Sequence, residues 1–311
     1  MDANEITIRQ GWPENLENIA RFLDNNWDFD SINPELLEEK LYLDPLADPE
    51  LCFTAFAGNE PVGFLFCVRR SIRGDEYGYV KLMAVDKSHR RKQLGSRMYE
   101  MAEQILVQKG ARIIRWYDVP LNYFMPGLDP RYTEAFCFAV KHGFQQFGEA
   151  VNMRVDLEAM EWSTRKEEEA LKEKGVEVRR AEMADVPAIR ELLSAEWQLW
   201  NNEVDMAMKD NPPSVHIAFI HKKLRAFSVH NGNNKGTGWF GPMGTHADMR
   251  GMGMGNILLK RCLEDMRLQG HRTAIIPWVA PIAFYTHYVK ARVERVFWRM
   301  EKKLKSDASP S

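Results

Sequence analysis

The hydrophobic pattern of the chain predicts the same order of elements twice. Apolar and polar residues alternate at 6–9 and again at 176–179, which predicts a short first strand in each half. Apolar residues three and four apart follow each strand and predict an amphipathic helix. These residues are Leu16, Ile19, Phe22 and Leu23 in the first half, and Ile189, Leu192, Leu193 and Trp197 in the second.

Four more strands and a second amphipathic helix are predicted in each half. Two apolar runs around a turn signal predict a hairpin, and a third run leads into a glycine-bearing loop and a helix. The strands are expected at 51–57, 61–68, 79–85 and 112–117, and at 215–220, 224–229, 238–245 and 273–278. With a third helix and a sixth strand after these, each half follows the order β-α-β-β-β-α-β-α-β.

One segment recurs at a constant offset of 160 positions, which is the distance from Arg90 to Arg250. Residues 82–110 and 242–270 each contain a short apolar run, a basic loop and a helix that ends at glycine. The same offset pairs Gly95 with Gly255 and Gly110 with Gly270. This agreement predicts a duplicated domain. We expect domains at 4–157 and 176–304, with a charged helical connector at 158–175.

Composition and charge narrow the class of protein. The 311 residues are 45% hydrophobic and 28% charged, with a net charge of −2. Without a basic excess, we expect no nucleic-acid or membrane-surface partner. No apolar run approaches the ~20 residues that span a bilayer, and no signal peptide is evident. Four scattered cysteines without zinc spacing predict free thiols, no metal site and a reducing, cytoplasmic location.

The loop from Arg250 to Gly255 has the features of an anion site. Its three glycines permit unusual backbone conformations and let a ligand approach the main chain. A helix that begins near Gly253 presents unpaired N–H groups, which together with the helix dipole suit a pyrophosphate. Arg250 and Asn256 can assist. An isolated glycine-rich loop is more often a plain connection, but this one joins a strand to a periodic helix and recurs in register.

The pattern Arg-x-x-Gly-x-Gly after a strand resembles the acetyl-CoA signature of the GCN5-related N-acetyltransferases (GNAT superfamily). Arg250, Gly253 and Gly255 occupy its three positions. The resemblance implies a mixed α/β chain with two tandem GNAT folds, similar in layout to mycothiol synthase. It also implies acetyl-CoA as co-substrate. The first half departs from the pattern, because Gln93 stands between Arg90 and Gly95 where a glycine belongs. CoA binding by that half is left open.

The resemblance also implies a catalytic tyrosine. GNAT enzymes often carry a Phe-Tyr pair after the fifth strand, and Phe284 and Tyr285 match it. A phenol with a pKa of about 10 can protonate the CoA thiolate, whose thiol pKa is about 8.5. Ala139 occupies the corresponding position in the first half. The second half departs from the family later in this helix, at Val289 and Lys290.

The resemblance implies that the main chain of the strand before the loop holds the pantetheine arm. The expected CoA-binding residues are Met243, Thr245, Arg250, Gly251, Met252, Gly253, Met254, Gly255 and Asn256. The general base is left open among His246, Asp248, His216, Glu203 and water.

The leading hypothesis is acetyl transfer from acetyl-CoA to an amine by direct attack in a ternary complex, in the second half. The alternative is a catalytically silent CoA-binding or interaction protein. An ATP or NAD enzyme is disfavoured, because neither the P-loop nor the Rossmann motif is present. The acceptor, a small molecule or a peptide, and the oligomeric state are left open.

Overall fold

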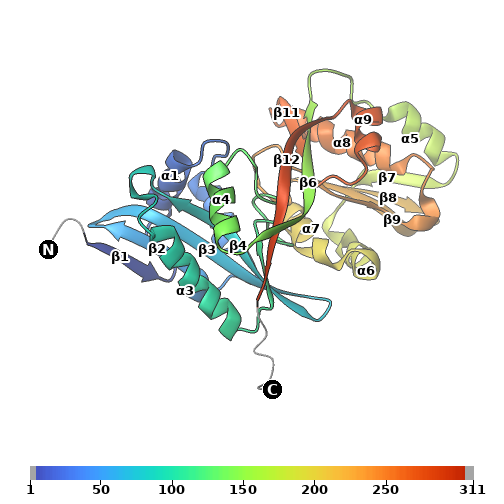
Figure 1. The fold of residues 1–311 in the computed structure, drawn as a ribbon. Coiled ribbons are helices and arrows are strands. Elements are labelled where there is room, and N and C mark those ends of the chain that lie inside the picture. The colour runs from blue at the N-terminus through green and yellow to red at the C-terminus, as the bar shows by residue number, and fades with distance from the viewer. Residues whose placement is uncertain (1–4, 305–311) are drawn as a thin grey trace. The chain divides into compact units, whose positions relative to one another are not determined.

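The computed structural model describes residues 5–304, which form two compact units (Figure 1). The first unit holds residues up to Ala150 together with the segment that begins at Phe297. The second unit runs from Val151 to Val296. Residue 4, where the first domain was expected to begin, lies outside the described residues. No helix among residues 5–304 is long and apolar enough to cross a membrane.

The first unit is a sheet with helices packed on it. Its elements are β1 (Ile6–Gln10), α1 (Leu16–Asn26), α2 (Pro34–Leu41), β2 (Cys52–Ala57), β3 (Glu60–Ile72), β4 (Asp75–Val85), α3 (Leu94–Gln108), β5 (Ile113–Trp116) and α4 (Thr133–Lys141). Strands β1 to β4 are antiparallel neighbours in chain order, and β5 lies parallel to β4. The sequence pattern did not predict helix α2, whose N-terminus is capped by the side chain of Asn33.

The second unit repeats this arrangement. Its elements are α5 (Arg165–Lys172), β7 (Val176–Arg180), α6 (Val186–Glu196), α7 (Asn201–Met208), β8 (Val215–Ile220), β9 (Lys223–His230), β10 (Phe240–Thr245), α8 (Met254–Leu268), β11 (Thr273–Ile276) and α9 (Ile282–Val289). Alternate residues of β8 pack on opposite faces. Val215 and Ile217 pack with α6 and α7, whereas Ala218 and Ile220 pack with α8. A sheet with two apolar faces thus separates two layers of helices.

Each unit takes a strand from the other half of the sequence. Strand β6 (Gln145–Asp156) ends in the second unit, where its residues 153–156 pair with β11. Strand β12 (Arg292–Lys303) ends in the first unit, where its residues 300–303 pair with β5. The units are therefore not the contiguous stretches 4–157 and 176–304. Periodicity identifies a strand but does not identify which of two similar sheet edges it joins.

The parallel pair β4 and β5 separates after four residues. Tyr77 to Val80 lie beside Ile113 to Trp116, and the last ladder bond joins the Tyr117 N–H to the Val80 carbonyl at 2.8 Å. From Lys81 onward, β4 has no strand neighbour on that side among residues 5–304. The second unit does the same: among residues 5–304, the pairing on this side is a single bridge between Trp239, just before β10, and Ile275 of β11. Both units thus expose the edge of the strand that leads into the glycine loop.

A buried ionic network supports the point where β4 leaves β5. The ammonium group of Lys81 lies 2.5 Å from Asp44 and donates to the side chain of Asn122 at 2.9 Å. Arg70 pairs with the same Asp44 carboxylate at 2.6 Å, and all these side chains are almost fully buried. Burial lowers the pKa of Lys81 to about 7, although Asp44 opposes this effect. One carboxylate is therefore shared by two buried basic side chains.

Asp44→Asn should lower the free energy of unfolding by about 3 kcal/mol or more, because it leaves Lys81 and Arg70 buried without their counter-charge. Urea unfolding measures the loss. Asp28→Asn is the matched control, because Asp28 pairs with Lys87 at the exposed surface. We expect the control to change stability by less than about 1 kcal/mol. Equal effects of the two variants would show that the buried network does not stabilise the unit.

Candidate functional site

The two glycine loops share one backbone conformation but differ in residue type. Gly251 and Gly253 have φ values of 84° and 88° in the left-handed region. Arg91 and Gln93, at the corresponding places in the first unit, have φ values of 63° and 64°. Side chains adopt this region at a cost, so the first unit keeps the loop geometry without the residues that favour it. The shared geometry agrees with a duplication.

Gly253 and Gly255 differ in what favours glycine. A Cβ added at Gly253 would have no atom within 4 Å, so its left-handed φ and the space beside it favour glycine. A Cβ at Gly255 would make ordinary van der Waals contacts, 3.6 Å from Thr245 and 3.7 Å from Phe284. The first turn of α8 therefore lies beside β10 and α9, and packing alone does not require glycine at position 255. Helix α8 begins at Met254, so the N–H groups of its first turn have no partner inside the helix.

The free edge of β10 presents main-chain groups to solvent. The N–H of His246 bonds to the carbonyl of Arg225 at 2.8 Å, which fixes the alternation along β10. Met243 and Thr245 therefore turn their main-chain groups away from β9. Among residues 5–304, no donor reaches their carbonyl oxygens. These are the residues whose main chain was expected to hold pantetheine.

The first unit satisfies the same positions with its own side chains. Met83 and Val85 correspond to Met243 and Thr245 at the 160-residue offset. The indole N–H of Trp27 donates to the Met83 carbonyl at 3.1 Å. The guanidinium of Arg90 donates to the Val85 carbonyl at 3.0 Å. Both acceptors on this edge are therefore occupied. In the described chain, Arg250 makes no corresponding bond.

Tyr285 lies where the loop, β10 and α9 meet. It is 8% exposed and packs edge-on against Phe240 and Phe284. Burial raises its pKa to about 12, so the phenol is protonated at neutral pH. Phe284 touches the Gly255 position, and Phe240 begins β10, so the structure brings the expected tyrosine to the expected strand and helix. In the first unit, Phe138 contacts Gly95 in the same way, and the next residue is the buried Ala139.

The candidate bases lie in different places. His246 and Asp248 share a side-chain hydrogen bond immediately after β10, and Glu196 lies 3.8 Å from the same imidazole. Glu203 is buried on α7. His216 belongs to a separate cluster around Asp265, about 17 Å along α8 from its start. Only His246 and Asp248 therefore adjoin the glycine loop.

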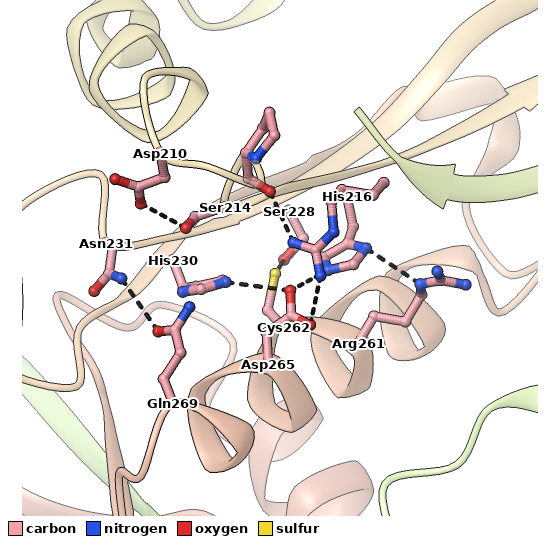
Figure 2. Close-up of polar contacts among 12 residues, drawn as sticks. Asp210, Ser214, His216, Ser228, His230, Asn231, Arg261, Cys262, Asp265 and Gln269 are labelled. Carbon is pink, nitrogen blue, oxygen red and sulfur yellow. Dashed lines mark hydrogen bonds and ion pairs between the residues drawn. The ribbon is translucent and has the colours of Figure 1, made fainter. Parts of the chain in front are cut away.

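The cluster around Asp265 is a feature that the sequence did not predict. Figure 2 shows His216 and His230 pointing at this carboxylate from the sheet, with Cys262 on the same helix. His216 lies 2.7 Å from Asp265 through Nε2 and accepts from Arg261 at 3.2 Å through Nδ1. Both ring nitrogens are engaged, so His216 is positioned as a packed neutral residue and not as a base. No local motif marks such a cluster, because its members are distant in sequence.

Trp197 is a second feature with a counterpart in the other unit. It caps the C-terminus of α6 as Trp27 caps α1. Trp197 stacks on Trp200 with ring centroids 5.6 Å apart, and its ring is 2.8 Å from where a Cβ of Gly244 would lie. It therefore covers the face of β10 opposite α8.

Comparison with known proteins agrees with this geometry. Residues 18–124 match the model of the Acetyltransferase (GNAT) family. The chain contains a GNAT domain. A search of curated proteins found no match to this GNAT chain. The family match falls on the half whose loop carries Gln93, and the likeness of the other half is one of structure.

Three solved structures resemble both units. A GCN5-related N-acetyltransferase from Sphaerobacter thermophilus has 17% identity and a TM-score of 0.69, over 98% of this chain and 97% of that one. A tandem GNAT protein from the clavulanic acid biosynthesis pathway has 13% identity and a TM-score of 0.66, over 97% and 100%. A GCN5-related glucosamine N-acetyltransferase region of a fungal multi-domain GH3 β-N-acetylglucosaminidase has 14% identity and a TM-score of 0.79, over 96% of this chain. This chain spans 38% of that protein. The fold is thus mixed α/β and of the tandem GNAT type, as predicted.

Acid should destabilise the second unit through His216. Burial lowers the pKa of His216, and the bond to Asp265 opposes this effect only in part. The unfolded chain takes up a proton near pH 6.5, which the folded state resists. Stability is therefore complete above about pH 6.5 and declines as the pH falls towards the lower folded pKa, by at most about 1.4 kcal/mol per pH unit. Thermal unfolding from about pH 7.5 to about pH 5 measures the decline.

His216→Gln should flatten this pH dependence, because glutamine does not titrate. His89→Gln is the control, since His89 lies in the other loop and is only partly buried. A slope in His216→Gln equal to that of the unmodified protein would contradict the assignment.

Proposed function

We propose that the protein transfers an acetyl group from acetyl-CoA to an amine, and that the second unit performs the reaction. The observation that carries this proposal is the unsatisfied main-chain edge at Met243 and Thr245, which lies beside the start of α8 and beside Phe284, the residue before Tyr285. The GNAT family supports acetyl-CoA as the acyl donor. The first unit has the same edge filled by Trp27 and Arg90 and lacks the tyrosine.

The chemistry of the residues fits CoA. Pyrophosphate would lie against the first turn of α8, where Gly251 and Gly253 leave the main chain accessible and Arg250 supplies a positive charge. The pantetheine amides would bond with the main chain of Met243 and Thr245, as a strand bonds with a sheet edge. A main-chain N–H on this edge can also stabilise the negative charge that develops on the thioester oxygen.

Tyr285 would act on the leaving group. The amine nitrogen forms a bond to the acetyl carbon, the carbon–sulfur bond breaks, and the sulfur leaves as a thiolate. A phenol with a pKa of about 12 does not readily give up its proton to a thiolate whose conjugate thiol has a pKa of about 8.5. Tyr285 is therefore a hydrogen-bond donor to the thiolate in the first instance. The proton released by the attacking nitrogen then balances the products, through Tyr285 or through water.

The catalytically silent alternative fits the first unit better than the second. In the first unit the carbonyls of β4 are already bonded, Gln93 replaces a loop glycine, and Ala139 replaces the tyrosine. Each of these differences is expected to disfavour CoA binding or acetyl transfer. The silent alternative for the whole chain requires that the second unit also lacks activity. Release of thiol from acetyl-CoA in the presence of a panel of amines separates the two functions.

Gly253→Val should weaken acetyl-CoA binding by at least about tenfold. The new side chain occupies the open space beside the loop and strains a left-handed backbone position, a strain of about 1–3 kcal/mol. Gly270→Val is the matched control, because Gly270 also has a left-handed φ and an open surrounding but lies at the far end of α8. Calorimetric titration of both folded variants with acetyl-CoA measures the two affinities. An affinity unchanged by Gly253→Val would remove this loop from the site.

Tyr285→Phe should lower kcat on the order of 10²-fold, the usual scale for a group that assists proton transfer. Acetyl-CoA affinity should stay nearly intact, and stability should change by about 1 kcal/mol, since only one hydroxyl is lost. Steady-state kinetics with an active acceptor measure the effect. The added change Gln93→Gly should not restore activity, because Ala139 still occupies the tyrosine position. Full turnover by Tyr285→Phe would exclude its hydroxyl from the reaction.

A further inference from the structure

The first unit encloses a cavity of about 430 Å³ at the position of its filled strand edge. The cavity lies between the C-terminal part of β4, the start of α3 and the helix α4, all within residues 26–141. Its volume is in the range of small-molecule sites. The cavity therefore survives in the unit whose main-chain acceptors for pantetheine are already taken.

A long connector forms one wall of this cavity. Residues 117–132 join β5 to α4 in the first unit, whereas residues 277–281 make the corresponding connection in the second. Met125, Leu128 and Tyr132 of the longer connector line the cavity. This connector is well anchored, because Leu128 pairs with Trp298 and the Tyr132 hydroxyl donates to Asp30 at 2.8 Å. The longer connector thus gives the first unit a cavity wall that the shorter connector of the second unit does not provide.

The walls of the cavity are largely aromatic and apolar. Trp27, Trp116 and Phe138 contribute rings, and Met83 lies beside them. Trp116 is 1% exposed, and its indole N–H meets no acceptor among the described residues. A buried donor without a partner costs free energy, which a ligand with an oxygen acceptor can recover. Aromatic walls with few polar groups are typical of sites for small organic molecules.

The charges at the cavity favour an anion. Arg90, Arg91 and Lys141 line it, against Asp28 and Glu134. Asp28 is already paired with Lys87 at 2.8 Å, so the balance is positive. The start of α3 adds the positive end of a helix of 15 residues. An anionic group of a ligand would be favoured near Arg91, with the remainder of the ligand against the rings.

We infer that the cavity of the first unit binds a small aromatic anion, such as an aromatic carboxylate or sulfonate, and not CoA. This site is independent of the acetyl-transfer site proposed in the second unit. Its ligand is short, because Trp27 and Arg90 occupy the carbonyls along which an extended pantetheine arm would bind. The 160-residue duplication has then produced two sites of different specificity from one cleft.

The probe is 8-anilinonaphthalene-1-sulfonate, whose fluorescence rises on binding to the full chain. We expect saturation at one site, an affinity about tenfold lower in Arg91→Gly, and loss of binding in Ala135→Trp, which fills the cavity. Arg91→Gly suits the left-handed backbone at this position, so it should remain folded. Gly253→Val should bind the probe as the unmodified protein does. Binding that is unaffected by both cavity variants would overturn the inference.

Alkylation of Cys137 locates the probe. Cys137 is exposed and lines the cavity, whereas Cys52, Cys67 and Cys262 are buried with raised pKa values. Iodoacetamide should therefore modify Cys137 first, and the probe should slow this reaction several-fold. Acetyl-CoA at concentrations that saturate the second unit should neither slow it nor displace the probe. Displacement by acetyl-CoA, with two CoA molecules bound per chain, would overturn the inference and make the cavity a second CoA site. The kinetics of Tyr285→Phe test acetyl transfer in the second unit separately, whichever result the probe gives for the cavity.

Discussion

The structure depends on two parallel strands that separate while one of them must continue to the glycine loop. A strand that leaves its neighbour exposes carbonyl and N–H groups that need new partners. In the first unit, Trp27 and Arg90 supply donors to Met83 and Val85. In the second, the described chain supplies none to Met243 and Thr245. The same backbone geometry is therefore closed in one unit and available to a ligand in the other.

This difference accounts for how the remaining residues are distributed. In the second unit, where the edge of β10 is unbonded, the left-handed loop positions are glycines and α9 carries Tyr285. In the first unit, where the edge of β4 is bonded, the loop carries Arg91 and Gln93 and α4 carries Ala139. A loop that no longer needs close approach to a pyrophosphate tolerates side chains, at the cost of local strain. Under the proposed function, a unit that does not bind CoA needs no tyrosine at the Ala139 position.

Each unit also buries charge, at a different place. The first unit places Asp44 between Lys81 and Arg70 where β4 leaves β5. The second places Asp265 of α8 against His216 and Arg180. Both carboxylates hold elements together through charge-assisted bonds that would be costly to leave half-made. The two units thus kept the fold while replacing the interior polar contacts that support it.

The sequence alone determined the repeated order of elements, the glycine loops and the place of Tyr285. These features are local, because periodicity, glycine and a short motif are read within a few residues. Tertiary structure decided the exchange of β6 and β12, since a strand pattern fits either of two similar sheet edges. It also decided that Trp27 and Arg90 cap the edge of β4, and that His216 faces Asp265 and not the loop. The Trp27 and His216 contacts join residues 56 and 49 positions apart, and no local pattern records which distant side chain satisfies a given polar group.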